Sequence, residues 1–135
     1  MITGLLLRHE GLKLKPYKCT SNKLTIGVGR NLDDNGISKD EAMYMLNNDI
    51  HRCIKEVESA FPFFHNLPTA RQDCLIDMCF NIGLTRLLGF KRMLKAIEDK
   101  DYVLAAMEMR DSKWYNQVTN RANELAYIME HNKEV

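Results

Sequence analysis

"HEGLKLKPYKCTSNKLTIGVGR", residues 9–30, is the stretch that decides the fold of this chain. The run LKLKPY (12–17) alternates apolar and polar residues, and LTIGVG (24–29) is β-branched with two glycines, so both runs are typical of short strands. TSNK (20–23) between them has the composition of a turn. The stretch therefore predicts a small sheet near the front of the chain.

A short helix is predicted before this sheet and a second turn after it. Residues 3–9 have a helical pattern, with Thr3 as the plausible N-cap and Gly11 as the C-terminal stop. The segment NLDDNG (31–36) has the composition of a turn.

The rest of the chain has helical periodicity. Ser38 and Glu41 form a capping box, which predicts a helix whose apolar stripe is interrupted by Asp49. Pro68 opens the next predicted helix and Gly83 ends it. Shorter helices are predicted near residues 90–100, 102–111 and 120–132. The predicted fold class is α+β, in which a small β-containing N-terminal lobe and a larger helical C-terminal lobe flank a cleft, within a single domain of residues 1–135.

The composition is that of an ordinary globular protein. With 135 residues, 45% of them hydrophobic and 27% charged, the chain is long enough to bury a core. A formal net charge of +1 predicts no strong attraction to nucleic acid or to a membrane. Residues 1–32 carry six Lys or Arg against one acid, which suits a polyanionic partner or a solvated loop face. The apolar patch in MITGLLLRHEG (1–11) is too short for a signal peptide or membrane anchor.

The four cysteines predict neither a disulfide framework nor a metal site. They form no CxxC pair and no metal-ligand spacing with the four histidines. Cys53, Cys74 and Cys79 lie on predicted apolar helix faces, where buried free thiols are common, and this favours synthesis in a reducing compartment. Cys19 is the one cysteine outside such a face.

Cys19 belongs to a group of three short polar side chains. Taken singly, Glu10 is a solvated residue at a helix end, Cys19 is an incidental loop residue, and Thr25 suits a strand. Taken together, the order of helix end, loop and strand, followed by the glycines of GVG (27–29), brings all three to one edge of a small sheet. They therefore form one candidate site for chemistry.

In this arrangement residues 9–30 resemble the catalytic front of the phage-type lysozymes, glycoside hydrolase family 24. The resemblance continues in order through ISKDEA (37–42), FNIG (80–83), GF (89–90) and SKWYNQVTNRA (112–122), and so covers nearly the whole chain. It implies a lysozyme-like fold and an endolysin that hydrolyses the β-1,4 bond between N-acetylmuramic acid and N-acetylglucosamine in bacterial peptidoglycan. It also implies no cofactor and no metal.

The resemblance assigns a role to each matching residue. Glu10 matches the catalytic acid, which protonates the leaving glycosidic oxygen. Thr25 matches a threonine that can hold a water beside the attacked face of the sugar. Arg121 matches an arginine that pairs with the catalytic glutamate and orients it, and Phe80 matches a cleft-lining residue against which a sugar can pack. Cys19 stands where relatives carry either Asp or Cys.

Cys19 leaves the site with a single carboxylate, so the second catalytic role stays open. A thiolate could polarise water, attack the anomeric carbon or stabilise positive charge, whereas a neutral thiol could do little of this. Lys18 and Lys23 would favour the thiolate if they lie close to it.

Four further residues complete these expectations. Arg30 stands where the best known family member has a histidine, so a histidine ion pair is not expected there. Glu108 and Met93 replace residues that contact sugar in that member, so no such contact is assigned to them. Trp114 is expected in the core rather than as a sugar platform.

The resemblance therefore implies a muramidase, expected to be monomeric, whose partner is anionic peptidoglycan, to which a basic front end is suited. It would be made in the host bacterial cytoplasm and act on the wall after release across the inner membrane. Three rival functions remain. A lytic transglycosylase needs only one carboxylate, a decayed enzyme could serve as a non-catalytic wall-binding module, and a thiol hydrolase could use Cys19 with His9 or His51.

Overall fold

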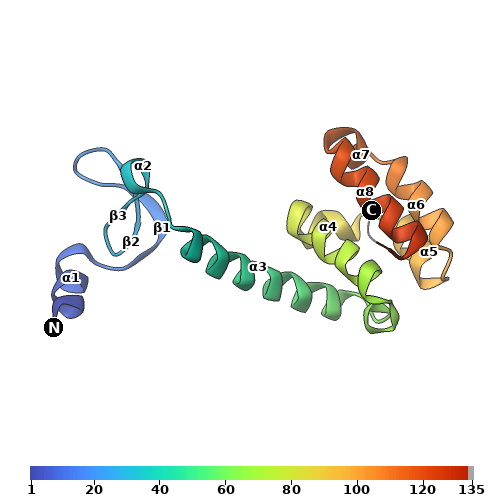
Figure 1. The fold of residues 1–135 in the computed structure, drawn as a ribbon, viewed down its shortest axis with the longest axis horizontal. Coiled ribbons are helices and arrows are strands. Elements are labelled where there is room, and N and C mark those ends of the chain that lie inside the picture. The colour runs from blue at the N-terminus through green and yellow to red at the C-terminus, as the bar shows by residue number, and fades with distance from the viewer. Residues whose placement is uncertain (134–135) are drawn as a thin grey trace. The chain divides into compact units, whose positions relative to one another are not determined.

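The computed structural model describes residues 1–133, and the chain divides into two compact units. The first unit is Met1–Leu46, and the second begins at Asn47. The first contains a short helix and a three-stranded antiparallel sheet, and the second is helical (Figure 1). The predicted α+β class, with the sheet in the N-terminal part and helices after it, is confirmed. That residues 1–135 act as one catalytic domain stays a prediction.

Helix α1 spans Ile2–Glu10 and ends where the sequence predicts. Gly11 has a φ of 74°, and its N–H donates to the Leu7 carbonyl at 2.9 Å, so a glycine closes the helix. The prediction of Thr3 as the N-cap is wrong. Met1 holds that position, and no side chain caps the first turn.

The sheet has the strand order β1-β2-β3, with β1 at Lys13–Lys18, β2 at Leu24–Gly27 and β3 at Arg30–Asn31. Both predicted strands are confirmed, and β3 is an addition that the sequence pattern did not reveal. Thr25 lies in the middle of the sheet, opposite Tyr17 on β1 and Asn31 on β3.

The segment predicted as a second turn contains a one-turn helix, α2, at Leu32–Asn35. The Asn31 side chain caps it by accepting a hydrogen bond from the Asp34 N–H at 3.0 Å. Asp33 accepts the Leu24 N–H at 2.7 Å, which ties α2 to strand β2. A turn-like composition and a short capped helix have the same residue preferences, so the sequence could not separate them.

Helix α3, Lys39–Ala60, begins at the predicted capping box. The Ser38 N–H donates to Glu41 Oε1 at 2.9 Å, and the Glu41 N–H donates to Ser38 Oγ at 3.1 Å. Its buried residues are Cys53 and Val57, both in the second unit. Asp49, which interrupts the apolar stripe, pairs with Arg52 one turn later at 2.8 Å.

The second unit confirms the later predicted helices. Gly83, with a φ of 81°, breaks the helix that follows Pro68 into two segments, as its predicted role as a helix stop requires. Trp114 lies on a short helix, in keeping with the short helical turn expected there, and it is buried as expected. The elements after α3 are the 3-10 turn η1 (Phe64–Asn66), α4 (Thr69–Leu88), α5 (Lys91–Glu98), α6 (Tyr102–Arg110), α7 (Lys113–Gln117) and α8 (Thr119–His131).

The hydrophobic core described by the structure lies in this second unit and draws on α3 to α8. Cys53, Cys74 and Cys79 are buried in it as free thiols, which confirms the prediction for these three residues. Burial raises the pKa of the Cys79 thiol to about 12 and that of Cys74 further still. These thiols therefore serve packing rather than reactivity.

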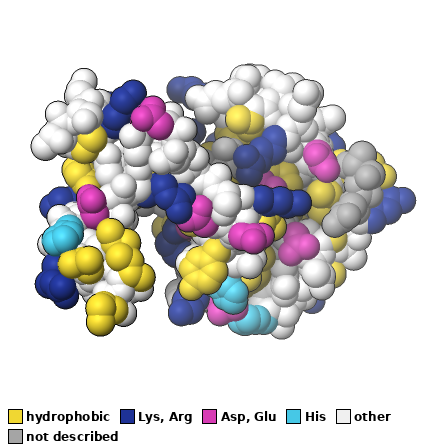
Figure 2. All heavy atoms as spheres, turned by 60° about the vertical axis from the view of Figure 1, so that its left-hand side comes forward, with side chains coloured by type: hydrophobic (Ala, Val, Ile, Leu, Met, Phe, Trp, Pro, Cys, Tyr) yellow, Lys and Arg dark blue, Asp and Glu magenta, His cyan; other side chains and the backbone are white. Residues whose placement is uncertain are grey.

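The surface mixes charge signs and exposed apolar side chains. Figure 2 shows Lys and Arg interspersed with Asp and Glu, and apolar side chains between them, on the face that it draws. No helix within residues 1–133 is long and apolar enough to cross a membrane.

Candidate active site

Glu10, the candidate acid, is the last residue of α1 and is exposed. Its side chain lies against the backbone of Gly29, in the turn between β2 and β3. A Cβ placed on Gly29 would be 2.7 Å from Glu10 Oε2 and 2.9 Å from Glu10 Cδ. Within the first unit the Glu10 carboxyl has no hydrogen bond or ion pair, and it packs against the backbone of this turn.

Cys19 follows β1 and begins the turn that leads into β2. Its N–H donates to the Lys23 carbonyl at 3.0 Å, and its carbonyl accepts the Asn22 N–H at 2.8 Å. Asn22 has a φ of 61°, a left-handed conformation that asparagine adopts more readily than most residues. The turn predicted at residues 20–23 is thus confirmed, and the Cys19 thiol beside it is partly exposed.

This turn lowers the pKa of the Cys19 thiol below its ordinary value of 9.0. The largest contribution comes from a backbone hydrogen bond with Lys23 and the next from one with Ser21, while partial burial opposes them. The sequence predicted a thiolate through the charges of Lys18 and Lys23. The direction agrees, but the cause is the backbone, and Lys23 Nζ lies 3.2 Å from Asp34 Oδ1 instead.

Thr25 lies beside Cys19 and is only 3% exposed. Its hydroxyl donates to the Lys23 carbonyl at 2.8 Å and is also within hydrogen-bonding reach of the Cys19 thiol. A hydroxyl has one proton, so it can serve only one of these acceptors at a time. The structure therefore brings Cys19 and Thr25 together, while the water-holding role of Thr25 stays a prediction.

The two other candidate residues belong to the second unit. Phe80 lies on α4 with 43% of its surface exposed, so its ring is open to contact. Arg121, on α8, donates from Nε to Asp77 Oδ1 at 2.7 Å and from Nη2 to the Asp77 carbonyl at 3.4 Å. Sequence reasoning missed Asp77 as a partner. The pairing of Arg121 with Glu10 stays a prediction.

Arg30, the residue that replaces a histidine, is held by two groups in the first unit. Its Nη1 and Nη2 donate to the two carboxylate oxygens of Glu41 at 2.9 and 2.7 Å, and Nη1 also donates to the Gly36 carbonyl at 3.1 Å. Hydrogen bonds from Arg30 and then Ser38 lower the pKa of Glu41 to about 2. This pairing fastens β3 to the start of α3.

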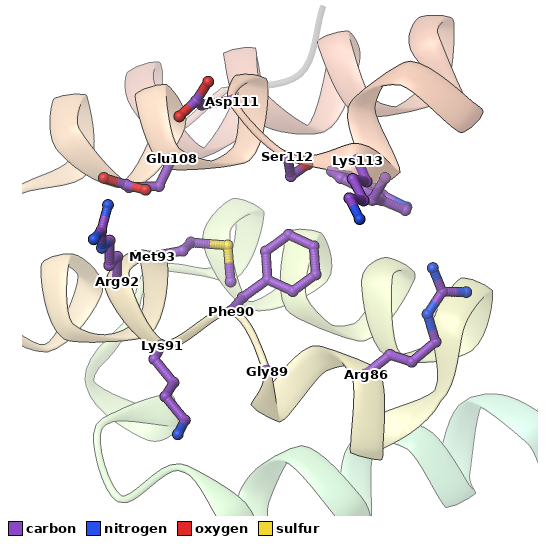
Figure 3. A pocket seen from close by; sticks show the side chains of 11 residues that line it. Arg86, Gly89, Phe90, Lys91, Arg92, Met93, Glu108, Asp111, Ser112 and Lys113 are labelled. Atoms are coloured by element: carbon purple, nitrogen blue, oxygen red, sulfur yellow. The ribbon is translucent and has the colours of Figure 1, made fainter.

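A cavity of about 500 Å³ opens in the second unit, between α5 and the segment that joins α6 to α7 (Figure 3). The Trp114 indole N–H donates to Asn81 Oδ1 at 2.8 Å, and the Phe90 ring meets the indole edge-on at 6.0 Å between centroids. Four basic and two acidic side chains surround these rings. The lining residues are Arg86, Gly89, Phe90, Lys91, Arg92, Met93, Glu108, Asp111, Ser112, Lys113 and Trp114.

The sequence did not predict this cavity. Glu108 and Met93, to which the resemblance assigns no sugar contact, both line it. Periodicity places residues on helix faces, but a cavity depends on how separate helices pack. As for metals, no cluster of three or more His, Cys, Asp or Glu suited to an ion occurs within residues 1–133.

Comparison with known proteins gives a consistent result. The phage lysozyme family profile matches residues 7–130. The chain is 30% identical to "Probable T4-type lysozyme 1" of Dictyostelium discoideum, over 96% of this chain and 93% of that protein. It is 30% identical to "Endolysin" of Acyrthosiphon pisum secondary endosymbiont phage 1, over 86% and 78%. It is 29% identical to "Pre-baseplate central spike protein Gp5" of Enterobacteria phage T4, over 93% of this chain and 27% of that protein.

Proposed function

Because the chain belongs to the phage lysozyme family, which consists of glycoside hydrolases of the muramidase type, we propose that it cleaves the β-1,4 bond between N-acetylmuramic acid and N-acetylglucosamine in peptidoglycan. The observation that carries this proposal is the family match over residues 7–130, which contains every candidate site residue.

In the proposed reaction the Glu10 carboxyl transfers its proton to the glycosidic oxygen as the bond to the anomeric carbon breaks. Water adds to that carbon, and the proton that it loses restores the Glu10 carboxyl. The Cys19 thiolate takes the place of the second carboxylate and faces the positive charge that develops on the sugar ring. The lowered pKa of the Cys19 thiol and its contact with Thr25 support this role.

The biological role proposed is that of an endolysin. The protein would be made in the host cytoplasm and act on the wall after release across the inner membrane. The relative described as an endolysin supports this role, because the match covers 78% of that protein. The match to a baseplate spike protein suggests a second, less favoured role in the virion. That match covers only 27% of the spike protein's length. Mass spectrometry of purified virions separates the two roles, because an endolysin is absent from the particle.

The chemical test is digestion of purified peptidoglycan by the wild type and by Glu10→Gln. The wild type should release muropeptides with reducing-end N-acetylmuramic acid. Glu10→Gln should keep the fold and lose about 10²–10⁴-fold in rate, because an amide cannot protonate the leaving oxygen. A dominant 1,6-anhydro product, lighter by one water, would favour the transglycosylase. No product from a folded wild type would favour the wall-binding module.

A further inference from the structure

We propose that Gly29 is a positioning residue for Glu10, because the space left by its absent side chain is the space in which the Glu10 carboxyl lies. This inference rests on the proposed function, in which Glu10 is the acid. Gly29 itself touches no reacting atom in this proposal and acts only through the place it leaves for that carboxyl.

The contact involves the whole end of the Glu10 side chain. A Cβ on Gly29 would lie 2.7 Å from Oε2, 2.9 Å from Cδ and 3.0 Å from Cγ of Glu10. Real Cβ atoms are essentially never found closer than 3.0 Å to another heavy atom. A side chain at position 29 and the observed conformation of Glu10 therefore exclude each other.

The backbone under the carboxyl is held on both sides. Gly29 lies in the two-residue turn between β2 and β3, and the pairing of Ile26 with Arg30 closes that turn. The Arg30 guanidinium is held in turn by both oxygens of Glu41. When a Cβ is added to Gly29, the Glu10 carboxyl must therefore move, because it is the free end of a flexible side chain.

Gly27 provides a matched comparison in the same turn region. Its φ is 72° and that of Gly29 is 66°, so alanine is strained in the same way at both positions. A Cβ on Gly27 would have nothing within 4 Å. Conformation alone accounts for glycine at position 27, whereas position 29 has both the conformation and the contact with Glu10.

The contact has a chemical consequence. To reach even the 3.0 Å limit from 2.7 Å, Oε2 must move by tenths of an ångström, and an ordinary contact of 3.4 Å requires more. An acid works only within hydrogen-bonding reach of the oxygen that it protonates, and a misplacement of about 1 Å can cost about 10²-fold in rate. Because these displacements are smaller than 1 Å, we expect Gly29→Ala to lower kcat by about 3- to 30-fold.

The experiment compares Gly29→Ala with Gly27→Ala in thermal unfolding and in kcat and KM on purified peptidoglycan. Both variants should lose similar amounts of thermal stability, and only Gly29→Ala should lose kcat, with KM little changed. In a Glu10→Gln background, Gly29→Ala should cause no further loss, because the displaced group no longer donates a proton. Equal kcat values for the two glycine variants would overturn the inference, as would a full further loss in the Glu10→Gln background.

Two additional variants keep the test decisive. If the alanine variants do not fold, Gly29→Asn and Gly27→Asn replace them, since asparagine tolerates a positive φ and still carries a Cβ. Glu10→Gln in the wild-type background separates the two proposals. If it stays active, the acid role of Glu10 fails. If it is inactive while Gly29→Ala matches Gly27→Ala, only the positioning role fails.

Discussion

Cys19 should be alkylated before any other cysteine, and its alkylation should stop wall hydrolysis. The perturbation is a small neutral alkylating reagent at pH 7, applied to the folded protein. Cys19 is partly exposed, whereas Cys53, Cys74 and Cys79 are buried. Reactivity follows thiolate content and access, and both favour Cys19.

The size of the preference follows from the pKa values of the thiols. The pKa of Cys79 is about 12, so about one thiol in 10⁵ is ionised at pH 7. A thiol at the ordinary value of 9.0 is ionised in about one case in 10², and Cys19 lies below that value. Cys19 thus leads by at least about 10³-fold in thiolate. The less basic Cys19 thiolate is also a weaker nucleophile, which reduces its advantage by a factor of about 10^1.2 to 10^1.5. Cys19 should therefore react at least about 30-fold faster than Cys79, and the burial of Cys79 should increase this difference.

The assay follows alkylation by peptide mass mapping and wall hydrolysis in the same samples over time. The first equivalent of reagent should be found on Cys19, the loss of hydrolysis should follow it, and substrate fragments should slow both. Cys19→Asp should remain active and insensitive to the reagent, because it restores two carboxylates. Cys19→Ala should be much weaker than the wild type.

Two results would refute this reasoning. Alkylation of Cys79 at a rate within a few-fold of Cys19 would contradict the difference in thiolate content. Full hydrolysis by Cys19→Ala would show that the thiol only fills space. The behaviour of Cys19→Asp also tests the thiol-hydrolase rival, since an enzyme that needs a sulfur nucleophile would lose all activity in that variant.

The remaining predictions concern the supports of the site. Glu41→Gln should lower the melting temperature at pH 7. The folded-state pKa of Glu41 is about 2 against an ordinary 4.5, so the difference from wild type should be full above about pH 4.5 and fade as the pH falls towards 2 in a melting series; a constant difference would contradict the link to Arg30. Trp114→Phe should cost about 1–3 kcal/mol in denaturant unfolding, because it leaves Asn81 Oδ1, the side-chain oxygen, without its 2.8 Å donor; an unchanged midpoint would show that water replaces it. Arg121→Ala should cost under about 1 kcal/mol, because its ion pair is about 40% exposed, yet slow lysis strongly; parallel losses in stability and lysis would point to a structural role only.

Local chemistry was enough to predict much of the first unit. Gly11 ends α1 because glycine readily adopts a positive φ. Ser38 and Glu41, three residues apart, cap the start of α3, because the side chain of each accepts a hydrogen bond from the backbone N–H of the other. The alternation of residues 12–17 and the β-branched run after residue 23 likewise predict strands. Each of these features depends on residues a few positions apart, and sequence patterns record such short distances directly.

The features that the sequence left undecided join residues that are distant along the chain. The α2 segment is held in place by a hydrogen bond from the Leu24 N–H to the Asp33 carboxylate. Strand β3 has two residues, too few to show the alternation of polar and apolar residues that marks a strand. The same holds for three contacts of the candidate site and the cavity: Glu10 with Gly29, Arg121 with Asp77, and Phe90 with Trp114. No composition or spacing encodes such contacts, because they arise only when helices and turns pack. The lowered pKa of the Cys19 thiol is a local exception: it comes from backbone hydrogen bonds with Lys23 and Ser21, four and two positions away, rather than from the expected lysine charges, because only the folded turn directs these groups at the sulfur.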